Sequence, residues 1–477
     1  MTSSPNTWEL LPFNAPILPV HAALLPPVNG GNAKILFLAG RRDEAGANCP
    51  NCSAVWDYTN GNSFSRSNTP LLSSGVTFDF FCSGHAFLSN GNLLIAGGTL
   101  QANPFLGLPD SIIFNSSTLN WEVQPSMAHG RWYPTLTRLG DERVIAISGK
   151  DENGLLNLVP EIYSPGTGWT AFSSPTVTIS DYANIFLLSD GRLFSAGRAN
   201  ARPYLITLPG SFSDPIITTS VSGLTDKPKT NYTTSAAAVL LPPAQDQKIM
   251  IIGGYKLNGS ATARVNVIDL KAANPTYQPA PYLNHARLHN QAVILPDRTV
   301  FVCGGSTVRN SIPDAVLVCE VYDPSTNTWT DVASHSIARL YHSIALLLPD
   351  GRVLLAGSNP PGQRELRMEI YSPSYMVDSR PVIDASPVEI SYGQTISIST
   401  AQASTIQWVQ LVRPSAVTHC MDVEQRLIDI PFTVIPETNS LSATIITNRN
   451  LAPSGWYMLN IVDDNRIPSV STWVHLT

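Results

Sequence analysis

Charged side chains are scarce in this sequence. Asp, Glu, Lys and Arg make up 13% of the 477 residues, the formal net charge is −6, and Lys and Arg form no cluster. Proteins that bind nucleic acids or anionic membranes attract them with basic clusters, so neither is expected as a partner. Small neutral molecules remain open as ligands.

Long apolar runs are also missing. No stretch reaches the roughly 18 consecutive apolar residues of a membrane-spanning helix. The N-terminal residues Met1 to Pro5 lack the basic-then-apolar order of a signal peptide. The sequence as written therefore shows neither a membrane span nor an export signal, and it leaves the location of the protein unknown.

Cysteine is too rare for a disulfide scaffold, with six in the chain. Cys49 and Cys52 flank a Pro-Asn pair, which fits a local disulfide, half a metal site or two free thiols. A zinc site would need a second such pair, and none occurs, so no catalytic role is expected of these two. Cys303 and Cys319 fall in consecutive predicted strands and are interpreted as buried apolar residues.

Proline and glycine are frequent, at 38 and 31 residues, which suits many short strands joined by tight turns. A repeated unit has an apolar strand, a turn of the Pro-Asp-Gly type and a second strand that ends in glycine. Its period of about 50 residues is the spacing of kelch propellers. The second strands end near Gly40, Gly98, Gly149, Gly197, Gly254, Gly305 and Gly357. Residues 1–380 are therefore predicted to form a seven-bladed kelch-type β-propeller.

The repeat disappears after residue 380, although segments with strand character continue. The simplest interpretation is an immunoglobulin-like β-sandwich over residues 381–477, which makes the whole protein all-β. This domain contains the phrase Thr418-His419-Cys420-Met421-Asp422. Packing alone does not explain such a run of polar and sulfur-containing side chains.

Aligning the repeats on their glycine-ended strands places chemically reactive residues in one register. They are Cys82, Tyr133, Tyr182, Ser235, His289 and His342. Equal registers of a radial repeat lie at equal depth around the central axis, so these residues are expected to meet. The sixth repeat has Leu288 before His289, whereas the seventh has Tyr341 before His342. The repeat itself therefore does not require that tyrosine, which favours a functional role for it.

The chemistry of this register favours copper. Imidazole and phenolate ligands in a tetragonal arrangement suit Cu(II), whereas zinc more often takes Cys, His and carboxylates. No acidic residue shares the register, which argues against magnesium and calcium. A redox metal there could also join Cys82 covalently to the phenol of Tyr133.

Four motifs, in this order, resemble those of the copper radical oxidases. They are Phe81-Cys82-Ser83-Gly84-His85, Arg131-Trp132-Tyr133-Pro134, Arg339-Leu340-Tyr341-His342-Ser343 and Thr418-His419. The resemblance covers nearly the whole chain, and Arg-Trp-Tyr-Pro makes it closer to glyoxal oxidase than to galactose oxidase. Galactose oxidase has a tryptophan stacked on its thioether, and no motif here assigns a residue to that place.

The resemblance implies a role for each matching residue. Tyr133 would be an equatorial copper ligand that is joined to Cys82 by a thioether and holds a radical. His342 and His419 would be the equatorial imidazoles, and Tyr341 the axial tyrosine that accepts the substrate proton. One copper ion per chain follows, together with the protein-derived Cys82-Tyr133 cofactor.

The resemblance also implies an activity, which is the oxidation of small aldehydes such as glyoxal or methylglyoxal, or of primary alcohols, by O2 with release of hydrogen peroxide. Members of the family are usually secreted or on the cell surface, and a monomer is expected here. Tyr182 and His289 are candidates for the substrate wall, with blade packing as the alternative. The alternative for the whole chain is a kelch propeller without chemistry that binds a protein or a glycan.

Overall fold

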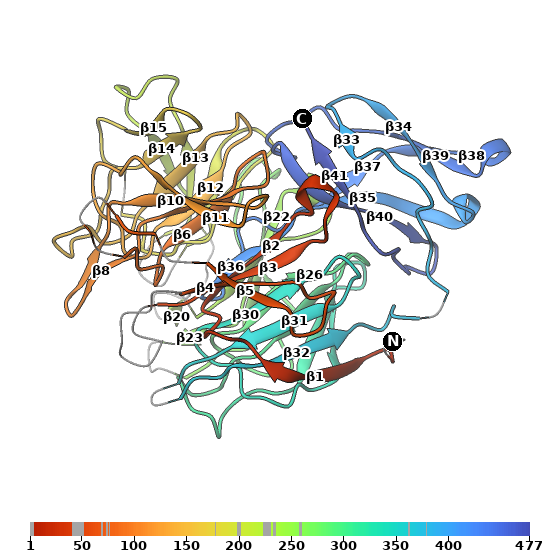
Figure 1. Ribbon diagram of the computed structural model, residues 1–477, viewed down its shortest axis with the longest axis horizontal. Coiled ribbons are helices and arrows are strands. Elements are labelled where there is room, and N and C mark those ends of the chain that lie inside the picture. Colours follow the sequence, from red (N-terminus) through yellow and green to blue (C-terminus); the bar gives the residue numbers. More distant parts are fainter. Residues whose placement is uncertain are drawn as a thin grey trace.

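The structure is a computed structural model, and it describes residues 4–40, 52–67, 70–72, 75, 77–176, 178–197, 202–222, 230–231, 235–256, 260–360, 363–377 and 379–477. Its regular elements are β-strands and a few one-turn 3-10 helices (Figure 1), which confirms the all-β prediction. None of the described helices is long and apolar enough to cross a membrane. Cys49 lies outside the described residues, so the three alternatives for Cys49 and Cys52, a local disulfide, half a metal site or two free thiols, stay open.

Tight turns at Asp-Gly and Asn-Gly explain why the strands are short. Gly351 has a φ of +93°, a left-handed conformation that glycine adopts without steric strain. The Asp350 carboxylate accepts a hydrogen bond from the Arg352 amide at 3.0 Å and closes the same turn. The turns at Gly91 and Gly191 repeat this design in other sheets.

Seven larger antiparallel sheets follow one another in the described part of residues 4–377, six with four strands and one with five. Two two-stranded sheets accompany them, formed by β8 (Thr99–Ala102) with β9 (Phe105–Gly107) and by β20 (Thr230–Asn231) with β23 (Tyr255–Lys256). The first three of the seven are β2 (His21–Leu25), β3 (Lys34–Leu38), β4 (Ser53–Trp56) and β5 (Phe64–Ser67) with the added β36 (Ala416–Thr418); β6 (Gly84–Phe87), β7 (Leu93–Ala96), β10 (Ser111–Asn115) and β11 (Asn120–Gln124); and β12 (Thr135–Arg138), β13 (Val144–Ile147), β14 (Glu161–Ser164) and β15 (Gly168–Ala171).

The other four sheets have the same plan. They are β16 (Ile185–Leu187), β17 (Leu193–Ser195), β18 (Tyr204–Thr207) and β19 (Ile217–Ser220); β21 (Ala237–Leu240), β22 (Lys248–Ile252), β24 (Val265–Asp269) and β25 (Gln278–Ala280); β26 (Gln291–Ile294), β27 (Val300–Cys303), β28 (Cys319–Asp323) and β29 (Thr328–Val332); and β30 (Ser343–Leu347), β31 (Val353–Gly357), β32 (Arg367–Ser372) and β1 (Thr7–Asn14). Repeated four-stranded sheets of this kind are typical of propeller blades.

The first strands of these sheets contact one another and form the centre of the assembly: β6, β12 and β16 are neighbours, as are β21, β26, β30 and β2. The N-terminal strand β1 is the outermost strand of the last sheet, where Trp8 pairs with Tyr371. This pairing joins the N-terminal segment to the last of the seven sheets. Residues that precede the central strands therefore gather at one end of the axis.

Buried ion pairs anchor three of the segments that lead into the central strands. The pairs are Arg131–Glu161 at 2.9 Å, Arg287–Glu320 at 2.7 Å and Arg339–Glu369 at 2.8 Å, and their side chains are at most 1% exposed. Each arginine also donates to a backbone carbonyl of its own sheet. A buried charge pair with several hydrogen bonds fixes the backbone a few residues ahead of the register positions.

We expect Glu320→Ala to lower the free energy of unfolding by about 3 to 5 kcal/mol, because it leaves the buried Arg287 guanidinium without a counter-charge. Denaturant titration measures this loss. The matched control is Asp190→Ala, which removes an exposed ion pair with Arg192 and should change stability by less than about 1 kcal/mol. Equal effects of the two substitutions would contradict the structural role of the buried pair.

The C-terminal strands form two further sheets. One contains β33 (Glu389–Ile390), β35 (Ile406–Val412), β37 (Leu427–Ile430), β40 (Gly455–Asp463) and β41 (Thr472–Leu476), and the other contains β34 (Thr395–Ser399), β38 (Phe432–Ile435) and β39 (Ser440–Thr444). One hydrophobic cluster joins Phe186 and Ile249 of the propeller to Leu411 and Leu459 of these sheets. The two parts thus share a core, and Figure 1 shows them side by side.

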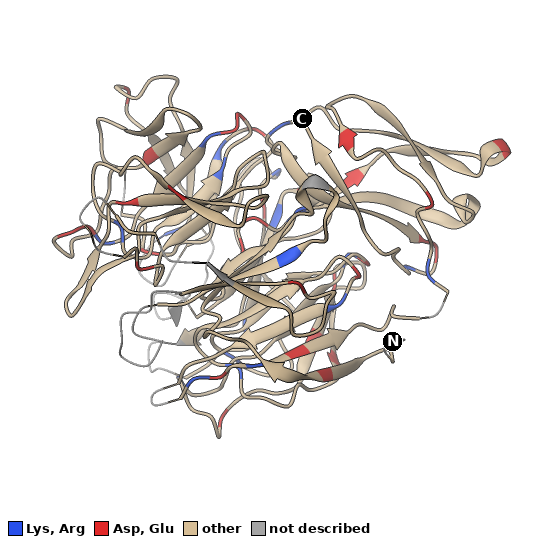
Figure 2. Ribbon diagram, viewed as in Figure 1, with Lys and Arg blue, Asp and Glu red and all other residues tan. Residues whose placement is uncertain are grey.

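Strand β36 leaves the C-terminal sheets and pairs with β2 of the propeller, with Thr418 opposite His21. His419 follows β36 directly and is carried to the central axis by this pairing. Charged residues are scattered over the whole ribbon (Figure 2).

Candidate active site

Most of the register positions share an unusual backbone conformation. Five of the six, namely Cys82, Tyr133, Tyr182, His289 and His342, have a positive φ between 46° and 67°. The sixth, Ser235, is not among the residues with a positive φ, and its carbonyl accepts from the His289 amide at 2.7 Å. Residues with a side chain seldom adopt this left-handed region, and such strain often marks a functional site. The Tyr133 amide donates to the Cys82 carbonyl at 2.9 Å, and the Tyr182 amide donates to the Tyr133 carbonyl at 2.7 Å. The common register inferred from the sequence is thus visible as a common geometry.

The segment between the buried arginine and the left-handed residue is one residue longer ahead of β30 than ahead of β12 or β26. Tyr133 and His289 each lie two residues after their buried arginines, Arg131 and Arg287. His342 lies three residues after Arg339, and it keeps the left-handed φ of 64°. The extra residue in this segment is Tyr341. It brings a second phenol to the axis without displacing the imidazole.

Four of the predicted ligands come together at this point. The Tyr133 and Tyr341 hydroxyl groups are in direct hydrogen-bond contact. The Tyr133 hydroxyl also lies 3.1 Å from Nε2 of His419. The rings of His342 and His419 meet edge to face, with centroids 4.5 Å apart. Two phenol oxygens and two imidazoles therefore share one buried location.

Neighbouring side chains fix the orientation of both imidazoles. Nδ1 of His342 lies 2.5 Å from the Asn359 side-chain oxygen, which can only accept, so Nδ1 carries the proton. The Thr418 hydroxyl donates to the Val20 carbonyl and accepts from Nδ1 of His419 at 2.5 Å. Nε2 of each ring is left with its lone pair. That tautomer is the one a metal ligand needs.

His419 sits in a two-residue hairpin turn. His419 and Cys420 have φ values of 50° and 66°, and the Met421 amide donates to the Thr418 carbonyl at 2.7 Å. Turns of this type usually contain Asn-Gly, because both central residues are left-handed. A His-Cys pair there is strained, and the pairing of β36 with β2 holds it in place. This turn pushes the imidazole beyond the end of the strand.

Tyr133 lies in a stack of aromatic rings. Trp132 packs on one face with centroids 3.7 Å apart and an interplanar angle of 13°, and Tyr182 packs on the other at 4.1 Å and 18°. Phe105 covers the outer face of Trp132 at 4.4 Å. Cys82 belongs to the same buried cluster. Aromatic rings thus enclose Tyr133, which lies beside the Cys82 thiol to which a thioether bond was predicted.

Sequence reasoning missed Trp132 as the residue that stacks on Tyr133. Adjacent residues of an extended chain point to opposite sides, so neighbours are not expected to stack. The left-handed Tyr133 reverses the chain and turns its ring back onto Trp132. Tyr341 and His342 stack in the same way, with centroids 3.9 Å apart. The one feature of the sequence that could have suggested this stacking is that Trp132 directly precedes Tyr133.

Tyr182 and His289 are the candidates for the substrate wall, with blade packing as the alternative. Tyr182 is buried, and its hydroxyl donates to the Ser83 carbonyl at 2.7 Å. His289 is buried beside Tyr341, with ring centroids 4.8 Å apart. The structure brings both rings to the phenols, Tyr182 against Tyr133 and His289 against Tyr341. Contact with a substrate stays a prediction for each.

Burial sets the electrostatics of the site. It raises the pKa of Tyr133, to which the adjacent Cys82 thiol adds, and it raises the pKa of Tyr341. It also lowers the pKa of His342 to about 4 and that of His419 well below its ordinary value. Both imidazoles are therefore neutral at neutral pH. A bound cation would offset burial by favouring the phenolates.

These donors fit copper. No group of three or more His, Cys, Asp and Glu side chains within the described ranges is placed to hold a metal, so a centre here has to include tyrosine. Two nitrogen and two oxygen donors are a set that suits Cu(II). Nε2 of His342 is buried and has no hydrogen-bond partner among the described residues, which leaves it available to a metal.

Comparison with known families identifies the fold and the class. The profile of the glyoxal oxidase N-terminus matches residues 43–377, well over half of the chain. The chain belongs to the copper radical oxidases. A second profile, the galactose oxidase-like early set domain, matches residues 380–476 of this copper radical oxidase. It covers the part that contributes His419.

Several characterised proteins are similar to this oxidase over nearly its full length. A galactose oxidase of Gibberella zeae is 27% identical over 98% of this chain and 70% of its own. An aldehyde oxidase of Arabidopsis thaliana is 26% identical, with 99% and 85% covered. A fungal alcohol oxidase solved in complex with copper superposes with a TM-score of 0.84 at 20% identity, covering 99% and 100% of the chains. The last comparison shows the fold.

Proposed function

We propose that this oxidase converts small aldehydes, of the glyoxal or methylglyoxal type, or primary alcohols, with O2 as acceptor and hydrogen peroxide as product. It does so on a seven-bladed kelch-type propeller capped by an immunoglobulin-like domain. One observation carries the proposal: the Tyr133 hydroxyl contacts both the Tyr341 hydroxyl and Nε2 of His419 at one buried point, and the ring of His342 lies against that of His419. The family relatives include a galactose oxidase and an aldehyde oxidase, so they leave both substrate classes open.

Four side chains would hold the metal: Tyr133, Tyr341, His342 and His419. When bound, copper supplies a one-electron redox couple that works beside the radical on Tyr133. Asn359 and Thr418 keep the two imidazoles in the ligating tautomer. One copper per chain follows from a single set of donors.

Cys82 and Tyr133 form the second redox centre of the proposal. A bond between the thiol sulfur and a ring carbon of Tyr133 removes two hydrogens, and O2 accepts the two electrons and two protons. The sulfur-substituted phenol is oxidised by one electron more easily than tyrosine. Trp132 and Tyr182, packed on its faces, shield the resulting radical from water.

Two side chains handle the hydrogens of the substrate. Tyr341 accepts the hydroxyl proton of the alcohol or aldehyde hydrate, and the Tyr133 radical takes a hydrogen atom from the carbon. The Tyr133 radical takes up one of the two electrons that the substrate loses, and the other would pass to copper when it is bound. O2 then accepts the two electrons and two protons as hydrogen peroxide. His289, packed on Tyr341, is placed to contact the substrate.

Replacing His419 with alanine should abolish stoichiometric copper binding and leave the propeller folded, because His419 lies at the tip of a turn outside the blades. Wild type is expected to bind one Cu(II) per chain. Metal analysis after copper loading measures both, and His129→Ala serves as a control because that histidine is exposed. Undiminished copper in His419→Ala would show that the C-terminal domain supplies no ligand.

We expect Trp132→Leu to retain copper but raise the potential of the Tyr133 radical by about 20 to 60 mV. This range converts the 0.5 to 1.5 kcal/mol that aromatic pairs typically contribute beyond area burial. A redox titration followed by the optical band of the radical gives the value. Trp132→Phe, which keeps a ring in the stack, should show a smaller shift. An unchanged potential in both variants would assign the stack to packing alone.

Peroxide release tests the function itself. Copper-loaded protein, activated with a one-electron oxidant, is offered a panel of aldehydes, primary alcohols and sugars under O2. Substrate-dependent hydrogen peroxide is the expected result. A protein that binds copper yet releases no peroxide from any of them would instead be a propeller that binds a protein or glycan without catalysing a reaction.

A further inference from the structure

Two buried histidines lie outside the four proposed ligands. His21 is on β2 and His85 on β6, and they are 0% and 7% exposed. None of their four ring nitrogens has a hydrogen-bond partner among the described residues. Buried polar atoms without a partner destabilise a folded protein, so native structures seldom keep them without a reason. Four such atoms in two neighbouring rings require a ligand or a water.

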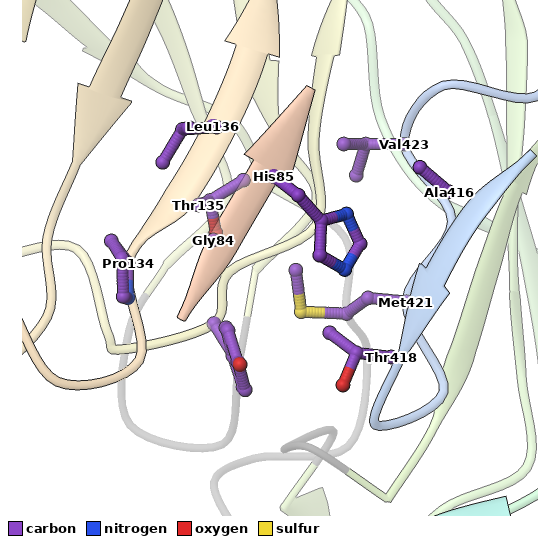
Figure 3. A pocket seen from close by; sticks show the side chains of 10 residues that line it. Gly84, His85, Pro134, Thr135, Leu136, Ala416, Thr418, Met421 and Val423 are labelled. Atoms are coloured by element: carbon purple, nitrogen blue, oxygen red, sulfur yellow. The ribbon is translucent and has the colours of Figure 1, made fainter. Parts of the chain in front are cut away.

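The two rings form a line that leads to the proposed copper site. The His85 and His21 ring centroids are 5.4 Å apart, and those of His21 and His419 are 5.8 Å apart. His85 also lines a cavity of about 20 Å³, together with Met421 and Thr418. Figure 3 shows the His85 imidazole and the Met421 side chain reaching into this space from β6 and from the loop after β36.

The cavity lining selects the type of ligand. His85 and Met421 line the cavity, and the His21 ring packs against the His85 ring beside it. No carboxylate is among the described residues that line the cavity, which argues against magnesium and calcium. Imidazole and thioether together form a soft donor set that favours Cu(I).

We propose that His21, His85 and Met421 form a second, soft metal site that binds Cu(I). This site is separated from the proposed catalytic copper by a single imidazole contact, that between His21 and His419. Its ligands come from two blades and from the turn that carries His419. Copper held there can pass to His419 and His342; this transfer, unlike the binding, rests on the proposed function.

Anaerobic titration of the full chain with Cu(I), against a chromophoric Cu(I) chelator, tests the site. Wild type should bind two equivalents, and X-ray absorption should find a sulfur neighbour for one of them. Loss of an outer-shell partner alone weakens metal sites by about tenfold to a hundredfold. Losing a ligand, in Met421→Leu or His85→Leu, should weaken one equivalent at least about a hundredfold and leave the other.

The controls separate this site from other sulfur and from the catalytic copper. Met127→Leu changes a buried methionine of another cluster and should still bind two equivalents. A single equivalent in wild type would overturn the proposal and leave the cavity to a water molecule, for which its volume suffices. A Met421→Leu variant that binds Cu(I) in the same way as wild type would also overturn the proposal. Cu(II) content and peroxide release are measured separately, so failure of the active-site proposal is recognised on its own.

Discussion

Tyr341→Phe should keep its copper and lose most of its turnover, by about a hundredfold to ten-thousandfold, the range for loss of a general base. The substitution removes one oxygen, the one in contact with the Tyr133 hydroxyl, and leaves the ring packed on His342 and His289. Steady-state peroxide release and metal analysis on the same sample measure the two effects. The turnover number should fall more than substrate affinity.

The matched control is Tyr371→Phe, another buried tyrosine. Its hydroxyl donates to Asn6, far from the axis, so its loss should leave turnover unchanged. A Tyr341→Phe variant with full activity would remove Tyr341 from the proton transfer. Loss of copper together with activity would instead make Tyr341 a necessary ligand.

Cys82→Ser should abolish the cross-link to Tyr133 completely. Wild type exposed to copper and O2 is expected to become lighter by about 2 Da, because a thioether forms with loss of two hydrogens. Intact-mass measurement before and after copper loading follows this change, and the serine variant should show none. Peroxide release should fall with it, since unmodified tyrosine is harder to oxidise.

A second buried cysteine gives the control for this experiment. Cys303→Ala removes a thiol of β27 that lies in a different hydrophobic cluster, and the mass should still fall on copper loading. Peptide mapping identifies the linked residues. If Cys82 remains fully open to alkylation in aerated, copper-loaded wild type, the protein-derived cofactor does not form.

The sequence was most informative about which residues lie at the same depth along the central axis. A register built only on Gly-ended strands placed Cys82, Tyr133, Tyr182 and His342 together, and the structure gives these residues the same left-handed φ and a common backbone geometry. The alignment succeeded because every blade repeats the same hydrogen-bonding pattern. Residues at equivalent positions of successive repeats therefore lie at the same depth along the central axis. The same alignment showed that the repeat does not require Tyr341, whereas the structure shows that Tyr341 is an additional residue in its segment.

The partners of the site could not be inferred in that way. Asn359 reaches His342 from the loop after β31, and Thr418 orients His419 through a hydroxyl of the preceding residue. Such contacts depend on side-chain directions and not on the repeat. Trp132 was missed because the sequence does not reveal that Tyr133 turns back on its neighbour. His21 and His85 showed no signal, since unpaired ring nitrogens appear only once the packing is known.

The pairing of β36 with β2 constrains the order in which the protein can fold during its synthesis. Thr418 lies 398 residues after Val20, to whose carbonyl its hydroxyl donates. During translation the edge of β2 therefore stays without this partner until residues 416–418 have been synthesised. His419 arrives with that strand, so the proposed redox centre cannot be completed on an unfinished chain. Biosynthesis itself then delays oxidative chemistry until both domains have folded and docked.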